Sequence, residues 1–270
     1  MRTAVVGHVE WVEFARVERV PTAGEIVQAS DWWAEAAGGG GVASVQLTGL
    51  AGSCTLFTAL GNDDLGEAAL AQLTGLGVRV EAARHAEPQR RGFTFVDGRG
   101  ERTITIIGEK HVPRGSDSLP WPELAGTDAV YFVSGDADAA RAARRARVLV
   151  ATARSLAVLE EAGVELDALV RSARDPSERY EDGDLEPAPR LVVATAGADG
   201  GVWNTSDGRA GSFAPRPLTN PIVDAYGAGD SFAAGLTYAL ARGDDVVPAV
   251  GFAAERASAA LTRRGAHGLE

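Results

Sequence analysis

The chain has 270 residues, of which 45% are hydrophobic and 23% are charged. This length accommodates one large α/β domain or two small ones, and it is sufficient for a sizeable hydrophobic core. Its 26 basic and 37 acidic residues give a net charge of −11, which argues against nucleic acid as a partner bound through a general basic field. No apolar run approaches the roughly 20 residues of a membrane-spanning helix, so we expect no membrane partner.

The chain contains a single cysteine, Cys54, and a single lysine, Lys110. One cysteine excludes an internal disulfide and a multi-cysteine metal site. The lysine lies outside any G-x-x-x-x-G-K-[ST] motif, so phosphate groups would be bound by glycines, helix ends and arginines. The N-terminal segment reads directly into a strand without the features of a signal peptide, from which we expect a cytoplasmic location.

Short β-branched runs alternate along the chain with Ala-, Leu- and Arg-rich stretches of helical length. The expected strands are residues 3–9, 54–60, 129–133, 148–153, 168–170 and 191–196. The expected helices are residues 64–75, 137–147 and 155–162. This alternation predicts an α/β fold in which helices flank both faces of a central, mostly parallel sheet. Residues 174–190 are charged and contain prolines, and we interpret them as a solvated helix plus loop.

Two stretches depart from this rhythm because apolar and polar residues alternate in them, at residues 12–20 and 93–107. The second contains the turn-forming pair Asp97-Gly98, which is typical of a β-hairpin. We therefore expect a small antiparallel β lid, formed by about residues 10–36 and 91–108 and inserted into the α/β body. With this lid, residues 1–270 form a single domain.

Near the C-terminus, a run of turn residues changes into a helical stretch at Gly227, Ala228, Gly229 and Asp230. The two glycines let several backbone N–H groups converge at the start of a helix that runs to about Arg242, and such a helix start binds anions. A carboxylate beside that anion site can accept a proton from a substrate hydroxyl during phosphoryl transfer. The alternative is a tight loop in which the aspartate only caps the helix.

Residues 224–232 resemble the D-T-x-G-A-G-D-x-F signature of the ribokinase (PfkB) family of carbohydrate kinases, with Ala225 where the family usually has Thr or Ser. Further blocks similar to those of the family occur in the same order over most of the chain. They are Gly7 with residues 21–25, residues 38–41 with residues 61–66, residues 193–201, and residues 262–266. The resemblance implies a ribokinase-like fold, with the lid excluding water from the reaction.

The resemblance also implies a role for individual residues. Asp230 would be the catalytic base and contact the substrate, and Gly227, Ala228 and Gly229 would form the anion hole. The residues implied to bind ATP or an accompanying cation are Thr195, Gly197, Gly200, Asp224 and Gly265. A monovalent cation, K⁺, would lie near Asp224 and residues 264–266, and the lid could join two chains into a homodimer.

Three departures from the family pattern affect the substrate and metal sites. Val12 replaces the usual sugar-binding aspartate. Glu10 or Glu13 could take its place, and the alternative is that both are solvated charges. No asparagine follows the glycine run at residues 38–48, where Gly39 and Gly40 are nevertheless expected to approach the substrate. The N-x-x-E motif would align with residues 172–175, where Asp175 either holds Mg²⁺ through water or is an exposed helix-start residue.

Other candidate residues carry weaker signals. His8, His85, His111 and His267 lack the mutual spacing of metal ligands, so we expect them to be structural or surface residues. Adjacent residues on a strand point to opposite sides, so at most one of Trp32 and Trp33 faces a ligand. The expected carboxyl edge of the sheet also carries Arg154 and Arg171, either of which could meet phosphate oxygens.

We therefore predict an ATP- and Mg²⁺-dependent phosphotransferase, a carbohydrate kinase that phosphorylates a hydroxyl of a small sugar or sugar derivative. Two alternatives remain at this point. The chain could be a nucleoside kinase of the same family, or a catalytically degenerate member that binds a nucleotide or sugar without transferring phosphate.

Overall fold

A computed structural model of the protein describes residues 1–218 and 220–269. Its centre is a nine-stranded sheet in the order β13-β12-β11-β10-β9-β8-β1-β4-β5. The seven strands from β11 to β5 are mutually parallel, whereas β12 pairs antiparallel with both β11 and β13. The strands are β1 (Thr3–Val6), β4 (Cys54–Gly61), β5 (Arg79–His85), β8 (Ala129–Phe132), β9 (Val148–Thr152), β10 (Ala168–Ser172), β11 (Leu191–Thr195), β12 (Gly201–Thr205) and β13 (Ala210–Phe213).

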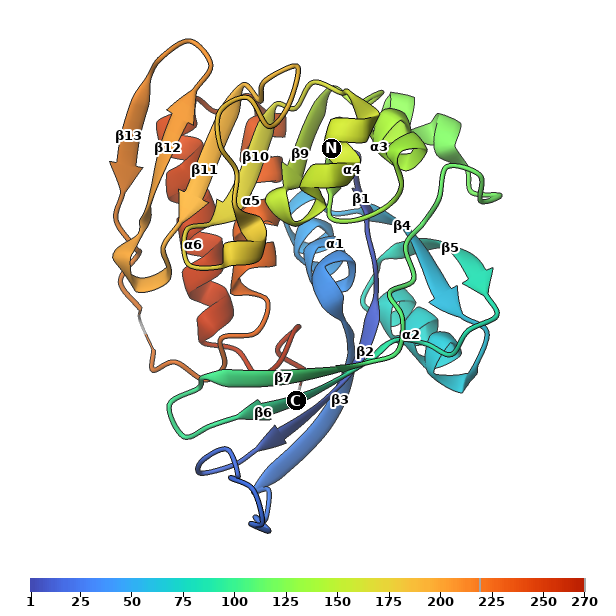
Figure 1. Ribbon diagram of the computed structural model, residues 1–270, viewed down its shortest axis with the longest axis vertical. Helices are drawn as coiled ribbons and strands as arrows, with labels where there is room; N and C mark the ends of the chain where they lie inside the picture. Colours follow the sequence, from blue (N-terminus) through green and yellow to red (C-terminus); the bar gives the residue numbers. More distant parts are fainter. Residues whose placement is uncertain (219, 270) are drawn as a thin grey trace.

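Helices cover both faces of this sheet, so the expected α/β architecture is confirmed (Figure 1). One face packs against α1 (Gly38–Ala51), α2 (Asp64–Gly75), α5 (Ala228–Arg242) and α6 (Val246–Leu261). The other packs against α3 (Ala137–Ala143), α4 (Leu156–Ala162) and the 3₁₀ helix η1 (Trp121–Gly126). Further 3₁₀ turns are η2 (Ala153–Ser155), η3 (Pro176–Glu178) and η4 (Gly197–Asp199).

Strand β1 shows why the parallel strands read as continuous apolar runs. Val5 belongs to the core beneath α1 and α5, whereas Ala4 and Val6 belong to the core beneath α3 and η1. Successive side chains point to opposite faces of a strand, and both faces of this sheet are covered. Each position therefore has to be apolar.

The lid is a separate four-stranded sheet at one end of the body, below it in Figure 1. Its order is β3-β2-β6-β7, from β2 (Glu10–Arg16), β3 (Asp31–Ala37), β6 (Arg91–Val96) and β7 (Arg102–Ile107). The pairs β2–β3 and β6–β7 are antiparallel, and a parallel pairing of β2 with β6 joins them. The first expected lid stretch ends early, because β2 stops at Arg16 rather than continuing to position 20.

The two adjacent tryptophans of β3 point to opposite sides, as the strand geometry predicts. Trp32 is 61% exposed, whereas Trp33 is buried and stacks on Phe14, with ring centroids 4.9 Å apart. Phe14 also meets Tyr226 edge-on, at 5.1 Å. Trp33 therefore packs through Phe14 against the segment before α5.

Residues 174–190 differ from the expected solvated helix plus loop. They form one short 3₁₀ turn, η3, followed by irregular chain, and four of these residues are buried, namely Glu178, Tyr180, Leu185 and Pro189. The aromatic and aliphatic members pack into the core beneath α3 and α4, which the high local charge concealed. In the described part of the chain, no helix is long and apolar enough to cross a membrane.

Candidate active site

The start of helix α5 forms an open corner whose geometry suits an anion, and we call residues 227–230 the anion-binding corner. Gly227 precedes the helix with a φ of +74°, and a Cβ atom there would lie 2.9 Å from Cγ1 of Val42. This left-handed conformation and the lack of space both favour glycine. The first N–H groups of a helix have no acceptor within it, and they carry the positive end of its dipole. A Cβ on Gly229 would meet no described atom within 4 Å, so the corner is open toward a ligand.

Asp230 lies in the first turn of α5, where its half-buried carboxylate faces the start of α1. A Cβ on Gly39 would lie 3.0 Å from Oδ1 of Asp230 and 2.6 Å from a methyl of Val133. Burial raises the pKa of Asp230 to about 6, against the opposing charges of Arg154 and Arg102. A carboxylate with this pKa is ionised near neutral pH and is a stronger base than an exposed aspartate.

The glycine run at the start of α1 brings the end of β1 against the helix. Gly38 has a φ of +75°, and a Cβ there would lie 3.1 Å from the backbone nitrogen of Glu10. A Cβ on Gly40 would lie 2.6 Å from the carbonyl oxygen of His8. The predicted substrate residues Glu10, Gly39 and Asp230 are therefore placed around the same helix start.

Glu10 is buried, and it sits among basic groups. Its Oε1 lies 2.7 Å from Nε of Arg90 and 3.7 Å from Nε2 of His8. Burial raises the pKa of Glu10, and Arg90 followed by Lys110 are the largest opposing charges. Burial also lowers the pKa of His8 well below its ordinary value, with Lys110 and Arg90 adding to the effect. The alternative Glu13 instead pairs with Arg91 on the lid, at 2.5 Å.

Three cations lie around Glu10, and the sequence gave no signal of a site role for two of them. Arg90 precedes β6, Lys110 follows β7, and Arg154 lies in the 3₁₀ turn after β9. Burial lowers the pKa of Lys110, and the nearby Arg90 and Arg154 lower it further, against the attraction of Glu10. Arg90 and Lys110 lie on the two connections between lid and body, so only the folded chain brings them together with Arg154.

The segment after β10 supplies two carboxylates that hold Arg154. Nε of Arg154 lies 2.7 Å from Glu178, and its NH2 lies 2.6 Å from Asp175. Asp175 also caps η3 by accepting the N–H of Ser177. Glu178 accepts the backbone N–H of Ser172 and was missed, because it lies outside the expected N-x-x-E spacing. The predicted Mg²⁺ residue Asp175 therefore lies beside Arg154, and Glu178 joins it there.

The nucleotide-binding residues expected within residues 193–201 lie in a tight turn at the carboxyl end of β11. Thr195 is the last residue of that strand, and its hydroxyl donates to the carbonyl of Arg171. Gly197 and Gly200 have φ values of +60° and +79°. A Cβ on Gly200 would lie 2.1 Å from the carbonyl oxygen of Phe213, so only glycine fits the turn.

Asp224 and Gly265 lie together behind the anion-binding corner. The fully buried carboxylate of Asp224 accepts the N–H of Tyr226 at 2.8 Å and of Gly265 at 3.1 Å. Burial raises the pKa of Asp224. Asp224, the first residue of the family-like motif at residues 224–232, is thus a structural carboxylate. It joins the C-terminal segment to the loop before α5.

The lid is bound to the same two segments. Glu35 of β3 accepts the N–H groups of Ala266 and His267, at 3.0 and 3.1 Å. Burial raises the pKa of Glu35 to about 7, against those hydrogen bonds. At the opposite edge of the lid, the side chain of Arg102 donates to the carbonyl of Ala225. The lid therefore holds the loop that carries the anion-binding corner.

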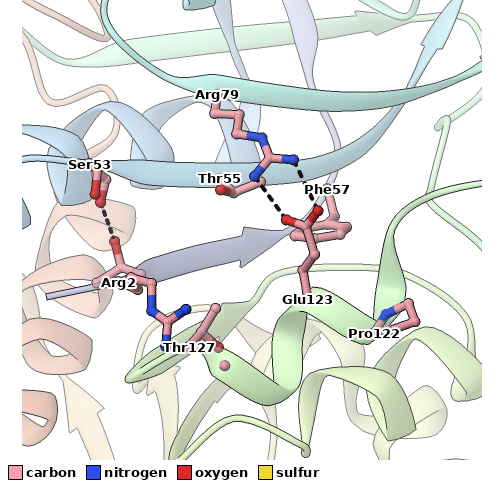
Figure 2. Close-up of a pocket in the computed structure, with 10 residues that line it drawn as sticks. Arg2, Ser53, Thr55, Phe57, Arg79, Pro122, Glu123 and Thr127 are labelled. Carbon is pink, nitrogen blue, oxygen red and sulfur yellow. Dashed lines mark hydrogen bonds and ion pairs between the residues drawn. The ribbon is translucent and has the colours of Figure 1, made fainter.

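One described cavity lies away from these residues. It has a volume of about 390 Å³ and opens at the amino ends of β1 and β4, with residues such as Thr3, Ser53 and Thr55 in its wall (Figure 2). Across it, Arg79 and Glu123 form an ion pair of 2.8 Å. Ligands of open α/β sheets bind at the carboxyl ends of the strands, so this cavity is not the active site.

Comparison with known proteins agrees with the geometry. A profile of the pfkB family carbohydrate kinases matches residues 2–163 and 164–269. The chain is 30% identical over 280 aligned residues to the ATP-dependent ribose-1-phosphate kinase of Halopiger xanaduensis, an alignment that covers 97% of this chain and 92% of that protein.

Solved structures share the fold at lower identity. The ribokinase of Thermotoga maritima superposes with a TM-score of 0.77 at 21% identity, covering 98% of this chain and 94% of that one. The adenosine kinase of Sinorhizobium meliloti superposes with a TM-score of 0.78 at 19% identity, covering 99% and 96%. The fold and the family resemblance expected from the sequence are thus confirmed, and the chain belongs to the pfkB family of carbohydrate kinases.

Proposed function

We propose that this kinase transfers the γ-phosphoryl group of ATP to the primary hydroxyl of a ribose-type sugar that already carries a phosphate. The observation that supports it is the group of cations around Glu10, formed by Arg90, Lys110 and Arg154. The Halopiger xanaduensis relative is described as a ribose-1-phosphate kinase, which agrees with a phosphorylated acceptor.

The charge balance of the pocket favours an anionic acceptor. Glu10 neutralises one of the three cations, and Arg154 is already held by Asp175 and Glu178. Lys110 forms no ion pair with a described residue, and repulsion from Arg90 contributes to its lowered pKa. Like charges held together disfavour the charged form, and a phosphate group would relieve the repulsion through charge-assisted hydrogen bonds.

The hydroxyl-binding residues usual in the family are absent, and Glu10 offers a replacement. Its buried carboxylate lies beside Gly38, at the point where α1 approaches β1. Carboxylate oxygens accept hydrogen bonds from sugar hydroxyls. Glu10 would therefore orient the sugar while Lys110 and Arg90 hold its phosphate.

Asp230 would take the proton of the attacking hydroxyl. The N–H groups of Gly227, Ala228 and Gly229 would stabilise the charge that develops on the transferred phosphoryl group. The open space beside Gly229 fits such a group. Thr195, Gly197 and Gly200, at the carboxyl end of β11, would contact ATP. Asp224 and Gly265 would hold the loop before α5 in place.

The residues after β10 suit a hydrated Mg²⁺ ion. Asp175 and Glu178 are hard oxygen donors at the carboxyl edge of the sheet, and Mg²⁺ commonly needs only one or two carboxylates besides phosphates and waters. When bound, Mg²⁺ neutralises phosphate charge. Any K⁺ dependence would be tested by replacing KCl with tetramethylammonium chloride in the assay.

The lid supports a homodimer as a further expectation. Its edge strand β7 is exposed along its length and presents Ile104 and Ile106 to solvent, at 39% and 42% exposure. Exposed edge strands pair readily with a second chain. Light scattering would detect the dimer, and the double variant Ile104→Lys, Ile106→Lys should give a monomer.

The acceptor is tested by ADP release from Mg·ATP with ribose 1-phosphate, ribose 5-phosphate, ribose and adenosine. We expect a sugar phosphate to give the highest kcat/KM. The Asp230→Asn variant should abolish turnover while it retains ATP binding. A preference for ribose or adenosine would contradict the phosphate subsite but not the kinase, whereas ATP binding without turnover for every acceptor would favour a degenerate member.

The cation variants test the subsite directly. Lys110→Met should raise the KM for the sugar phosphate by about 10- to 100-fold, the range of a lost hydrogen bond to a charged group. The KM for ATP should stay unchanged. Arg209→Met, which removes an exposed cation between β12 and β13, is the matched control.

A further inference from the structure

Three potential metal ligands lie outside the active site, where the lid joins the body. His85 is the last residue of β5, Glu87 follows it, and His111 lies after β7. One ligand atom from each of these side chains lies within 4.8 Å of the others. His85 and Glu87 thus lie where the chain leaves the body for strands β6 and β7 of the lid, and His111 lies where it returns to the body.

The side chains are free to act as ligands. Those of His85 and Glu87 form no hydrogen bond or ion pair with any residue that the structure describes. Nε2 of the buried His111 lies 2.8 Å from the carbonyl oxygen of Pro88. A histidine that donates one ring N–H to a carbonyl presents its other nitrogen as a lone pair, the usual arrangement of a metal-binding histidine.

The geometry of the two rings supports this grouping. The rings of His85 and His111 meet edge-on, with centroids 5.4 Å apart and an interplanar angle of 81°. Two ring nitrogens and one carboxylate oxygen can thus approach a common point by small rotations, and Glu87 is exposed and free to move.

We propose that His85, Glu87 and His111 bind a divalent transition-metal ion of the Zn²⁺ type. Imidazole nitrogen favours Zn²⁺, Ni²⁺ and Co²⁺, whereas Mg²⁺ and Ca²⁺ prefer oxygen ligands. Three protein ligands leave the fourth position of a tetrahedral ion for water. The site is distinct from the proposed Mg²⁺ position after β10, and it does not depend on the proposed function.

The ion would connect the two segments that carry the pocket cations. Arg90 lies three residues after Glu87, and Lys110 directly precedes His111. The hydrogen bond between His111 and Pro88 and the edge-on contact of the His85 and His111 rings already link the two connections. Bound metal would add a stronger link there and hold Arg90 and Lys110 at a fixed separation.

The test uses the full-length, chelator-treated protein without nucleotide. Titration with Zn²⁺ should give one site per chain by calorimetry, and Co²⁺ should give the intense visible bands of a tetrahedral ion. His85→Ala and Glu87→Gln should each weaken Zn²⁺ binding by at least about tenfold. Glu109→Gln, an exposed carboxylate in the same connection, should leave binding unchanged.

Two results would overturn the proposal. One is the absence of stoichiometric Zn²⁺ binding by the wild-type chain. The other is binding that persists unchanged in His85→Ala, which would place the ion elsewhere. Because His111 is buried and its substitution could unfold the chain, the two more accessible ligands carry the test, with circular dichroism confirming that both variants are folded.

Discussion

The buried carboxylate of Glu35, which joins the lid to the C-terminal segment, makes the stability of this protein dependent on pH. Glu35 is 1% exposed, and the N–H groups of Ala266 and His267 donate to one of its oxygens. Its other oxygen, Oε1, is buried without a hydrogen bond to a described residue. Burial raises the pKa of Glu35 from 4.5 to about 7, and the nearby charge of Asp224 adds to the rise.

The direction in which the unfolding free energy changes with pH follows from proton binding to Glu35. Between pH 4.5 and about 7 the folded chain holds a proton on Glu35 that the unfolded chain has released. The stabilising contribution is therefore complete below pH 4.5 and is lost as the pH rises through about 7. With about 1.36 kcal/mol for each pH unit, the loss is about 3 kcal/mol.

Glu35→Gln removes this dependence while its amide oxygen can still accept both N–H groups. We expect the difference in unfolding free energy between wild type and variant to change by about 3 kcal/mol from about pH 4.5 to about pH 8, with the wild type losing more. Urea denaturation at a series of pH values gives both curves. Glu101→Gln is the control for removing one lid carboxylate, and curves for Glu35→Gln and wild type that stay parallel would refute the reasoning.

Further predictions concern catalysis. If Asp230 is the base, kcat/KM should fall tenfold per pH unit below its pKa of about 6, and a profile flat down to pH 5 would exclude it. Glu178→Gln should move that midpoint to lower pH, because the charge of Glu178 raises the pKa of Asp230. Gly227→Ala should cost about 1–3 kcal/mol of stability and most of kcat, because of its positive φ and the contact with Val42. Gly243→Ala, at the other end of α5 with φ +91° and no described atom within 4 Å of a Cβ, should lose stability but retain kcat.

Several sequence expectations correspond closely to the structure because their signals are local. Helix α2 has the predicted bounds of residues 64–75, and Asp63 caps it by accepting the N–H of Gly66. The glycine-rich start of α5 was identified because positive φ values and unpaired helix N–H groups are properties of a few consecutive residues. The lid followed from strand alternation in the same way.

The side chains that were missed act through contacts across the fold. Glu178 belongs to a segment that the sequence predicts to be solvated, yet it is buried and pairs with Arg154 of a different strand connection. His85 and His111 are 26 positions apart, so their spacing gave no metal signal until the lid connections were placed side by side.

The sequence by itself determined the architecture, the lid, the glycine-rich start of α5 and the family, because these depend on periodicity and on short motifs. Only the tertiary structure decided the surroundings of Glu10, the raised pKa of Glu35 and the meeting of Arg90, Lys110 and Arg154. The physical reason is that desolvation and Coulomb interactions depend on distance in space, and the residues concerned come from separate lid and body segments.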